Sequence, residues 1–369
     1  MLSATILCIV GARPNLIKIC PVFQALAATP GLEPRLLHTG QHYDDRMSDR
    51  FLVDLPIPAP EWNLNVGSAS HAKQTADIMT RFEPVLLEVK PRAVLVVGDV
   101  NSTIACALVA AKLGIEVIHV EAGLRSFDRS MPEEINRMLT DRISDVLFTT
   151  EPAGDRHLKA EGVDPASIHQ VGNVMIDTLV AHLDRAVPVS VTTGGRVADG
   201  APFAALTLHR PSNVDDPAVL TPLLDAIADI ARDLPVIFPV HPRTRGRIEA
   251  FGLGDRLSAP GMIALEPLGY LEMLGLTSRA TVVMTDSGGL QDETTGLGVP
   301  CLTLRENTER PITMEVGTSL LIGTDADRLR REVAAVRAGT APKGAIPPLW
   351  DGHAAERIAA ILGERYGRD

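Results

Sequence analysis

The fold of this protein can be worked out from residues 115–126, IEVIHVEAGLRS. The run from Ile115 to Val120 is mostly apolar and predicts a buried parallel strand. Carboxylates and arginines follow directly after it, at Glu121, Arg125, Glu133, Glu134 and Arg137. Ligands of open α/β sheets bind beyond the carboxyl ends of the strands, where this charge is concentrated. The stretch therefore predicts an α/β fold with a functional site at the end of this strand.

The composition describes a globular protein with more than one core. A chain of 369 residues is too long for one ordinary core, so we expect two domains. Hydrophobic residues make up 45% of the chain, charged residues 22% and aromatic residues 4%, which is typical of a soluble protein rich in aliphatic side chains. The net charge of −11 argues against non-specific binding to nucleic acids or membranes, because both carry negative charge. An anionic small substrate still fits if basic residues cluster locally.

The cysteines and the N-terminus favour a cytoplasmic protein. Cys8, Cys20, Cys106 and Cys301 show no CxxC spacing and stand among apolar or small residues, so we expect buried thiols in a reducing compartment. The first ten residues are apolar but lack a basic leader, and we interpret them as a strand. No apolar stretch approaches the roughly 20 residues that a membrane-spanning helix needs.

Strands alternate with helices along the first half of the chain. Aliphatic runs predict strands at Leu7–Val10, Arg35–His38, Ala93–Val97, Ile115–Val120, Val146–Thr149 and Ile168–Val171. Helical patterns follow from Asn15 and over Ala105–Leu113. This regular alternation predicts a doubly wound parallel sheet over about the first 170 residues.

The second half repeats the architecture with a different sequence. Residues 186–202 are rich in Pro, Gly, Val, Thr and Ser and show no helical period, so we expect a surface connection there. Strands are predicted at Phe203–Leu208, Pro235–Val240 and Ala280–Met284. An amphipathic helix is predicted over His353–Arg365.

Polar residues follow several strands of the first half. Arg13 and Lys18 flank a predicted helix N-terminus and can hold a phosphate or a carboxylate, although ordinary surface cations would look the same. Gln41 and His42 are candidate ligand contacts, with a self-capped loop as the alternative. Asp99 ends a strand, where an aspartate is often only a helix N-cap.

Polar clusters also end three strands of the second half. The first two contain His209 and His241, and the third is Thr285-Asp286-Ser287-Gly288-Gly289. That third turn precedes a helix and predicts an anion cradle for a diphosphate, with Glu293 one turn into the helix. Further along, Arg305 and Arg310 either face a phosphate or pair with Glu306 and Glu309.

Together these clusters predict acid/base chemistry on an anionic nucleotide ligand. We expect a cleft between the two domains, with carboxylates whose desolvation accompanies closure. The sequence contains no His-Glu-x-x-His spacing for a metal and no Gly-x-Ser-x-Gly nucleophile elbow. The alternative for the central segment is a structural ion-pair network among Glu121, Arg125, Glu133 and Arg137.

The motifs, taken together, resemble one enzyme family. They are Gly11-Ala12-Arg13-Pro14 with Lys18, Gly98-Asp99, His119–Arg125, Pro132–Arg137, His209-Arg210, Pro239–Pro242, Thr285–Glu293 and Thr308–Pro311. In this order and spacing, from about residue 5 to 360, the chain resembles the non-hydrolysing UDP-N-acetylglucosamine 2-epimerase family.

The resemblance implies a fold, a reaction and an assembly. The fold would be glycosyltransferase-B-like, with two Rossmann-like doubly wound parallel-sheet domains facing a central cleft. The N-terminal domain would span residues 1–171 plus the C-terminal helix 352–369, and the UDP-binding domain residues 172–351. The reaction would interconvert UDP-N-acetylglucosamine and UDP-N-acetylmannosamine without a cofactor, through a 2-acetamidoglucal held beside UDP. The assembly would be a homodimer.

The resemblance also implies roles for single residues. The acid/base carboxylates would be Asp99, Glu121 and Glu133, and His209 would stabilise the leaving diphosphate. The diphosphate would bind to Arg13, Ser287, Gly288 and Gly289, and the ribose hydroxyls to Glu293. The pocket would be completed by Lys18, Gln41, His42, Arg137, His241 and Arg310.

Three alternatives remain open from the sequence. A hydrolysing relative would release UDP and free N-acetylmannosamine, with the same residues. A glycosyltransferase of the same fold would need an acceptor groove and would not explain the carboxylates at Asp99, Glu121 and Glu133. A nucleotide-sugar sensor would bind UDP without consuming a UDP-sugar. Neither the substituents of the sugar nor the pathway follows from these motifs.

Overall fold

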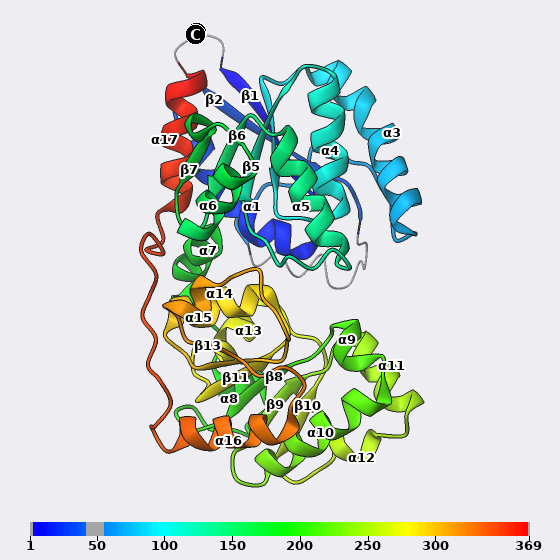
Figure 1. The fold of residues 1–369 in the computed structure, drawn as a ribbon, viewed down its shortest axis with the longest axis vertical. Coiled ribbons are helices and arrows are strands. Elements are labelled where there is room, and N and C mark those ends of the chain that lie inside the picture. The colour runs from blue at the N-terminus through cyan, green and yellow to red at the C-terminus, as the bar shows by residue number, and fades with distance from the viewer. Residues whose placement is uncertain (1–2, 42–54, 368–369) are drawn as a thin grey trace. The chain divides into compact units, whose positions relative to one another are not determined.

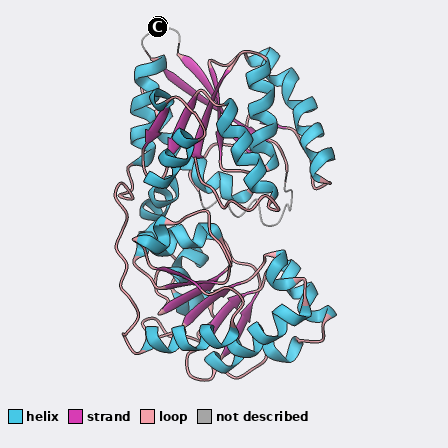
Figure 2. Ribbon diagram, in the orientation of Figure 1, coloured by secondary structure: helices cyan, strands magenta, loops and turns pink. Residues whose placement is uncertain are grey.

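The computed structural model describes residues 3–41 and 55–367 of the chain (Figure 1). The chain divides into two compact units. The first comprises Met1–Val180 and Pro348–Asp369, and the second comprises Ala181–Pro347. In each unit, helices flank a parallel sheet (Figure 2). The predicted α/β class with two doubly wound domains is therefore confirmed.

Within the described residues, the first unit holds a seven-stranded sheet in the order β3-β2-β1-β4-β5-β6-β7. All pairings are parallel. The strands are β1 (Ala4–Val10), β2 (Leu32–His38), β3 (Trp62–Asn63), β4 (Ala93–Val97), β5 (Glu116–Ala122), β6 (Val146–Thr149) and β7 (Ile168–Gln170). The helices are α1 (Arg13–Ala27), α3 (His71–Val89), α4 (Asn101–Lys112), α5 (Pro132–Ile143), α6 (Pro152–Ala160), α7 (Val174–His182) and α17 (Ala354–Tyr366), with a 3-10 turn at Pro165–Ser167.

The central strands of this sheet are buried on both faces. All five residues of β4 are buried, as its purely aliphatic sequence predicts. One face packs against α3 and α4 through a core that includes Leu7, Val94, Val96 and Phe82. The strands thus place their carboxyl ends, and the loops that follow, at one edge of a rigid core.

The C-terminal helix α17 belongs to the first unit, where it packs against α1 (Figure 1). The buried carboxylate of Asp177 accepts hydrogen bonds from the backbone N–H groups of Ala354 (3.2 Å) and Ala355 (2.6 Å) at the start of this helix. Near its other end, Arg365 pairs with Glu116 of β5 at 2.8 Å. Both ends of the returning helix are therefore tied to the first sheet and its helices.

The second unit holds a six-stranded parallel sheet in the order β10-β9-β8-β11-β12-β13. The strands are β8 (Ala204–Thr207), β9 (Val236–Pro239), β10 (Met262–Leu265), β11 (Val282–Thr285), β12 (Cys301–Thr303) and β13 (Ser319–Leu321). The helices are α8 (Val189–Thr192), α9 (Pro211–Val214), α10 (Pro217–Ala231), α11 (Pro242–Ala250), α12 (Gly254–Leu257), α13 (Tyr270–Thr277), α14 (Gly288–Leu297), α15 (Ile312–Glu315) and α16 (Ala326–Arg337), with a 3-10 turn at Leu183–Arg185.

Alternate residues of β8 and its approach belong to two different cores. Ala204 and Leu206 pack in the cluster that includes α10 and α16, whereas Phe203 and Ala205 pack in the cluster on the opposite face. Because successive side chains of a strand point to opposite faces, this division shows a sheet covered on both sides. The second unit is thus doubly wound like the first.

The segment 186–202 lies mostly at the surface, as predicted, but it is anchored at a few buried residues. It contains the short helix α8, and Val189 and Val197 are buried in the core beneath β8. The backbone of Val187 lies so close to Gly275 that an added Cβ there would be 1.9 Å from the Val187 carbonyl oxygen. The absence of a helical period gave no sign of α8 or of these anchors, because two isolated valines can anchor a segment that has no periodic pattern.

In both units the strand order reverses beside the first strand, between β1 and β4 and between β8 and β11. Such switch points are where ligands of open α/β sheets bind, because the loops on the two sides diverge there. Among residues 3–41 and 55–367, no helix combines the length and the apolar sequence needed to cross a membrane.

Candidate active site

Three residues meet at the switch point of the first unit. Lys18, in the second turn of α1, forms an ion pair with Glu121 at the end of β5, and both side chains are buried. Gly98, which follows β4, has φ +70°, and an added Cβ there would lie 3.3 Å from both the Glu121 Oε2 and the Lys18 Nζ atoms. The close fit explains why only a glycine suits this turn. The structure therefore brings the predicted Lys18 and Glu121 into direct contact.

The backbone of Glu121 is strained. Its φ is +72°, in the left-handed region, and the register of β5 against β6 shifts between Val120 and Ala122. A non-glycine residue in this region costs on the order of 1 kcal/mol or more, and such costs concentrate at functional sites. The bulge thus turns the Glu121 side chain toward Lys18.

Asp99 is held by an arginine of α5. The Arg137 Nη2 atom lies 2.5 Å from the Asp99 Oδ2 atom, and Arg137 Nη1 lies 2.7 Å from the Oε2 atom of the buried Glu134. Glu133, in contrast, is exposed on the first turn of α5. The Asp99 carboxylate remains 25% exposed and so faces a region that a ligand can reach.

The alternative of an ion-pair network was predicted for Glu121, Arg125, Glu133 and Arg137. In the structure, three of these residues form ion pairs with residues outside that set. Glu121 pairs with Lys18, Arg137 with Asp99 and Glu134, and Arg125 with Asp141 and Glu161. The residues are arranged as separate pairs with partners that the local spacing did not indicate.

Gln41 is tied to α3 and α4. Its side-chain oxygen accepts hydrogen bonds from the Ser102 backbone N–H (3.0 Å) and hydroxyl (2.6 Å), and its backbone carbonyl accepts one from Gln74 (3.1 Å). These bonds connect Gln41 to two distant helices, which neither the predicted ligand contact nor the alternative of a self-capped loop describes. His42 lies outside the described residues. Arg13 is the first residue of α1.

The switch point of the second unit is organised by Asp286. This fully buried carboxylate accepts hydrogen bonds from the backbone N–H groups of His209 (2.9 Å) and Arg210 (2.8 Å) and from Asn213 Nδ2 (3.1 Å). The His209 Nδ1 atom lies 2.8 Å from Asp286 Oδ1. The imidazole of His209 is therefore held in place with its other nitrogen available to a ligand.

Burial alone would raise the pKa of Asp286, but the hydrogen bond and charge of His209 and the N–H groups of the same loop outweigh it, so that the pKa of Asp286 is lowered. His241 caps α11 by accepting a hydrogen bond from the Arg243 N–H at 3.2 Å. Its ring centroid lies 5.7 Å from that of His209. The two predicted histidines are thus neighbours.

The predicted anion cradle is the N-terminus of α14. Ser287 is its N-cap residue, and Gly288 and Gly289 form its first turn. The Arg310 side chain approaches this turn and pairs with Asp292 (Nε to Oδ2, 2.7 Å) and with Glu309. Free N–H groups and an arginine together suit an anionic ligand.

Glu309 joins the two arginines of the following loop. It pairs with Arg305 at 2.7 Å and also with Arg310. Pairing with Glu309 was one of the two interpretations of these arginines, and it is confirmed. Glu306 instead accepts a hydrogen bond from the backbone N–H of Thr324 at 3.3 Å.

Gly288→Ala is expected to weaken binding of a diphosphate ligand and to lower the free energy of unfolding by about 1–3 kcal/mol. An added Cβ would lie 2.7 Å from both Arg310 Nη1 and Glu309 Oε1, so the arginine would have to move. Calorimetric titration with UDP and chemical denaturation measure the two effects. Gly246→Ala in α11 is the matched control, because no atom lies within 4 Å of its added Cβ. Equal behaviour of the two variants would show that the cradle tolerates a side chain.

Glu293 is buried on the second turn of α14. Burial, aided by the negative charge of Asp292, raises the pKa of Glu293 to about 8. The folded protein therefore holds Glu293 mainly as a neutral acid at neutral pH. A neutral carboxyl group can donate a hydrogen bond as well as accept one, which suits contact with a hydroxyl group.

Glu293→Gln is expected to stabilise the second unit at about pH 8 by roughly 4 kcal/mol and to have little effect on stability below about pH 4.5. The folded pKa exceeds the unfolded one, so the stability that Glu293 contributes is complete below the unfolded pKa and is lost as the pH rises toward 8. Denaturation at the two pH values tests this, with the exposed Glu315→Gln as control. A constant difference between variant and wild type across this range would contradict the assignment.

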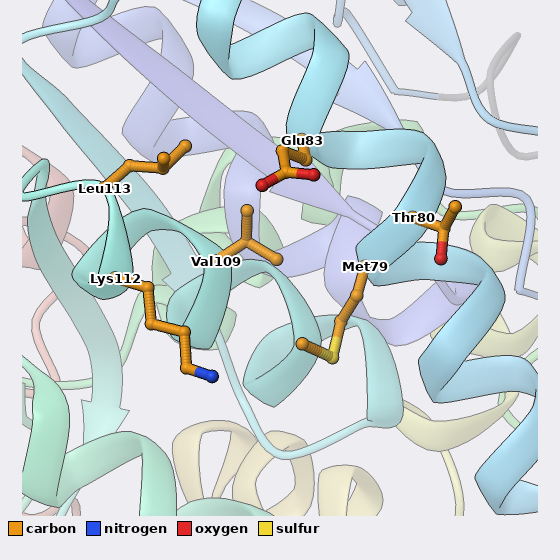
Figure 3. A pocket seen from close by; sticks show the side chains of 6 residues that line it. All are labelled: Met79, Thr80, Glu83, Val109, Lys112 and Leu113. Carbon is orange, nitrogen blue, oxygen red and sulfur yellow. The ribbon is translucent and has the colours of Figure 1, made fainter.

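A pocket of about 280 Å³ lies between α3 and α4, apart from these residues (Figure 3). It is lined by Met79, Thr80, Glu83, Val109, Lys112 and Leu113. None of the predicted site residues lines it, so it has no part in the chemistry considered above. In the described part of the chain, no three His, Cys, Asp or Glu side chains are grouped so that they could hold a metal ion.

Sequence reasoning missed several residues that shape these sites. Asp286 belongs to the predicted anion cradle Thr285–Gly289 but was not predicted to be a site residue. It follows β11 as Asp99 follows β4. The same rule of polar residues after parallel strands would have selected it. Asp141, which contacts His119 and Arg125, carried no such signal because it lies in the last turn of α5 and does not follow a strand.

Known proteins with similar sequences and structures are named as 2-epimerases of UDP-sugars. The family model described as UDP-N-acetylglucosamine 2-epimerase matches residues 24–363. The UDP-N-acetylglucosamine 2-epimerase of Methanocaldococcus jannaschii is 42% identical over 366 residues, 98% of each chain. The UDP-2,3-diacetamido-2,3-dideoxy-D-glucuronate 2-epimerase of Pseudomonas aeruginosa is 40% identical over 363 residues, 97% of this chain and 99% of the relative.

Solved structures agree with the sequence comparison. A crystal structure of the M. jannaschii UDP-GlcNAc 2-epimerase in complex with UDP-GlcNAc and UDP superimposes with a TM-score of 0.89 at 40% identity, over 98% of this chain and 99% of that one. The UDP-GlcNAc 2-epimerase of Neisseria meningitidis bound to UDP-GlcNAc gives a TM-score of 0.86 at 28% identity, over 98% of this chain and all of the other.

Proposed function

Because the chain belongs to the UDP-N-acetylglucosamine 2-epimerase family, we propose that it interconverts UDP-N-acetylglucosamine and UDP-N-acetylmannosamine by the non-hydrolysing route. The observation that carries the chemical part of this proposal is the buried Lys18–Glu121 pair, set at a strained strand end beside Gly98. A buried carboxylate next to a partly exposed one, Asp99, suits the removal and return of a proton.

The reaction consists of an elimination and an addition. A base removes the proton at C-2 of the sugar, the C-1 to C-2 double bond forms, and the bond from C-1 to oxygen breaks with its electron pair going to UDP. Re-addition of UDP after protonation from the opposite face gives the epimer. The proton at C-2 is weakly acidic, so its removal needs departure of a well-stabilised anion at the same time.

The first unit would supply the acid/base groups and the second unit the nucleotide site. Asp99, Glu121 and Glu133 are proposed to move the protons. His209, kept in position by Asp286, is proposed to stabilise the leaving diphosphate. Ligand binding is assigned to Arg13, Lys18, Gln41, His42, Arg137, His241, Ser287, Gly288, Gly289, Glu293 and Arg310. Because its side chain is bonded to Ser102, Gln41 would contribute to ligand binding indirectly, by holding its loop in place.

Proton NMR in deuterium oxide tests the activity. Incubation with UDP-N-acetylglucosamine should introduce deuterium at C-2 and produce a growing UDP-N-acetylmannosamine signal with little free UDP. Free UDP with N-acetylmannosamine would instead identify a hydrolysing enzyme. An unchanged spectrum would contradict the proposal for this substrate.

A second candidate substrate is favoured by the comparison with the P. aeruginosa relative, which is named for UDP-2,3-diacetamido-2,3-dideoxy-D-glucuronate. The identities to the two kinds of relative, 42% and 40%, are nearly equal. The same NMR experiment with both UDP-sugars decides between them through the ratio of the two kcat/KM values.

The proposal also includes a cytoplasmic homodimer. Cys8, Cys20, Cys106 and Cys301 are all free and buried, which supports a reducing compartment. Light scattering coupled to size-exclusion chromatography measures the assembly. A mass of about 39.5 kDa, that of a single chain, would contradict the dimer.

A further inference from the structure

His119 is a fully buried residue of β5, two positions before Glu121. Both of its ring nitrogens have oxygen partners. The Nδ1 atom lies 2.7 Å from Asp141 Oδ1, and the Nε2 atom lies 2.8 Å from the backbone carbonyl oxygen of Gly98. The imidazole therefore connects α5 to the turn after β4.

These two contacts fix the protonation of the ring. A backbone carbonyl only accepts hydrogen bonds, so the Nε2 atom must carry a hydrogen. The Asp141 Oδ2 atom accepts hydrogen bonds from Arg125 Nη1 (2.7 Å) and from the Gly123 N–H (3.1 Å), both of which favour an ionised carboxylate. A carboxylate at Asp141 also accepts, so the Nδ1 atom must carry a hydrogen as well.

The surrounding charges make a buried imidazolium acceptable. Arg125 also bonds Glu161 through Nε (2.8 Å) and Nη2 (2.6 Å). The cluster of His119, Arg125, Asp141 and Glu161 thus contains two positive and two negative groups. Buried charges are tolerated when they are paired and hydrogen-bonded in this way.

The same contacts hold the backbone on both sides of Glu121. Asp141 bonds His119 two residues before it and the N–H of Gly123 two residues after it. The Gly98 N–H donates to the Val120 carbonyl at 3.1 Å, while the Gly98 carbonyl accepts from His119. The peptide between Gly98 and Asp99 is therefore clamped to β5 at the place where Glu121 adopts its left-handed conformation.

We propose that His119, as an imidazolium held by Asp141, is a positioning residue that fixes the strained Glu121 and the turn leading to Asp99. His119 does not touch the substrate. It acts through the backbone of the two carboxylates, and this role rests on the epimerase function proposed above. Active-site groups need such support because a displacement of about 1 Å can cost about 100-fold in rate.

Nitrogen NMR of protein labelled with ¹⁵N-histidine tests the charge state without requiring activity. At about pH 8, where an exposed histidine is neutral, we expect both nitrogens of His119 to carry hydrogens. Its signal is identified by nuclear Overhauser contacts to the Asp99 N–H. His169 of β7, whose pKa is lowered by burial and by the charge of Arg365, serves as the neutral reference. A nitrogen of His119 without a hydrogen would overturn the proposal.

His119→Gln tests the positioning role. We expect kcat to fall about 10- to 100-fold while KM and the affinity for UDP stay within about twofold, because the proposed nucleotide-binding residues of the second unit are unchanged. The matched control is His169→Gln, which should leave kcat unchanged. An unchanged kcat in His119→Gln would overturn the positioning role, even if that variant melts at a lower temperature.

Two further outcomes separate this inference from the proposed function. If wild-type protein leaves UDP-sugars unchanged although His119 carries both hydrogens, the epimerase function and the positioning role are overturned, but the imidazolium is supported. If His119→Gln does not fold, the wild-type nitrogen spectrum still decides the charge state on which the proposal depends.

Discussion

Glu121→Gln is expected to lower kcat by about 10²- to 10⁴-fold while leaving the affinity for UDP nearly unchanged. Glutamine has the size of glutamate and can still accept a hydrogen bond from Lys18, but it cannot take up or return a proton. Because Glu121 is the most deeply buried of the three proposed carboxylates and stands in a strained conformation, we expect its loss to have the largest effect on turnover.

Two measurements made on the same preparation test this expectation. Deuterium incorporation at C-2 reports proton removal, and calorimetric titration with UDP reports nucleotide binding. Glu83→Gln, on the exposed face of α3, is the control for a simple loss of one carboxylate. Turnover near the wild-type level in Glu121→Gln would remove this residue from the mechanism.

The stability of the Glu121→Gln variant must be measured as well. Removing one charge of a buried ion pair leaves Lys18 without a counter-ion, and the breaking of such pairs costs up to about 3–5 kcal/mol. A folded variant with intact UDP binding and no deuterium incorporation would separate the chemical role from this structural cost. Lost UDP binding together with an altered circular dichroism spectrum would indicate that the pair mainly supports the fold.

Asp286→Ala is expected to destabilise the second unit by about 3–5 kcal/mol. The substitution leaves the N–H groups of His209 and Arg210 and the amide of Asn213 without their shared acceptor. It also releases the imidazole of His209 from its partner. We therefore expect weaker binding of UDP in addition to the loss of stability.

The positions of the tryptophans allow the two units to be followed separately. Trp62 and Trp350, the two tryptophans of the chain, both belong to the first unit. In urea, tryptophan fluorescence therefore reports the first unit, whereas far-ultraviolet circular dichroism reports both. Asp286→Ala should add an early transition in circular dichroism that fluorescence does not show. The exposed Asp327→Ala, which loses only a surface pair with Arg330, should not add it.

The lowered pKa of Asp286 sets the lowest pH at which its carboxylate stabilises the second unit. Its folded pKa lies below the unfolded value, so the stability it contributes is present above the unfolded pKa and is lost as the pH falls through the folded one. The difference between wild type and Asp286→Ala should thus be full at neutral pH and shrink in acid below about pH 3.8. A difference that persists unchanged in strong acid would contradict a role for the ionised carboxylate.

Much of the fold followed from the sequence because burial leaves a direct trace in it. The run at Ala93–Val97 is aliphatic and that at Ile115–Val120 is mostly apolar, since strands covered on both faces favour apolar side chains. Polar clusters directly after such runs marked Asp99, Glu121, His209 and the Ser287 turn as site candidates, because the carboxyl ends of parallel strands meet at one edge. Local patterns of this kind need no knowledge of distant contacts.

Pairings between distant residues could not be predicted in the same way. Lys18 and Glu121 are 103 positions apart, and His209 and Asp286 are 77 apart. They meet because of the order of the strands in each sheet, in which β1 lies beside β4 and β8 lies beside β11. The hydrophobic periodicity of the sequence does not encode this order. The same holds for Gln41 and Ser102 of α4, which are 61 positions apart.

By itself, the sequence determined the α/β class, the positions of most strands and the kinds of side chain that follow them, since these depend on burial and spacing along one segment. It did not predict the short strands β3, β10, β12 and β13. Only the tertiary structure decided that Glu121 stands at a bulge with φ +72°, that it faces Lys18, and that His119 and Asp141 hold the backbone around it. A strained conformation persists only where surrounding contacts from other elements enforce it, and those contacts exist only once the chain has folded.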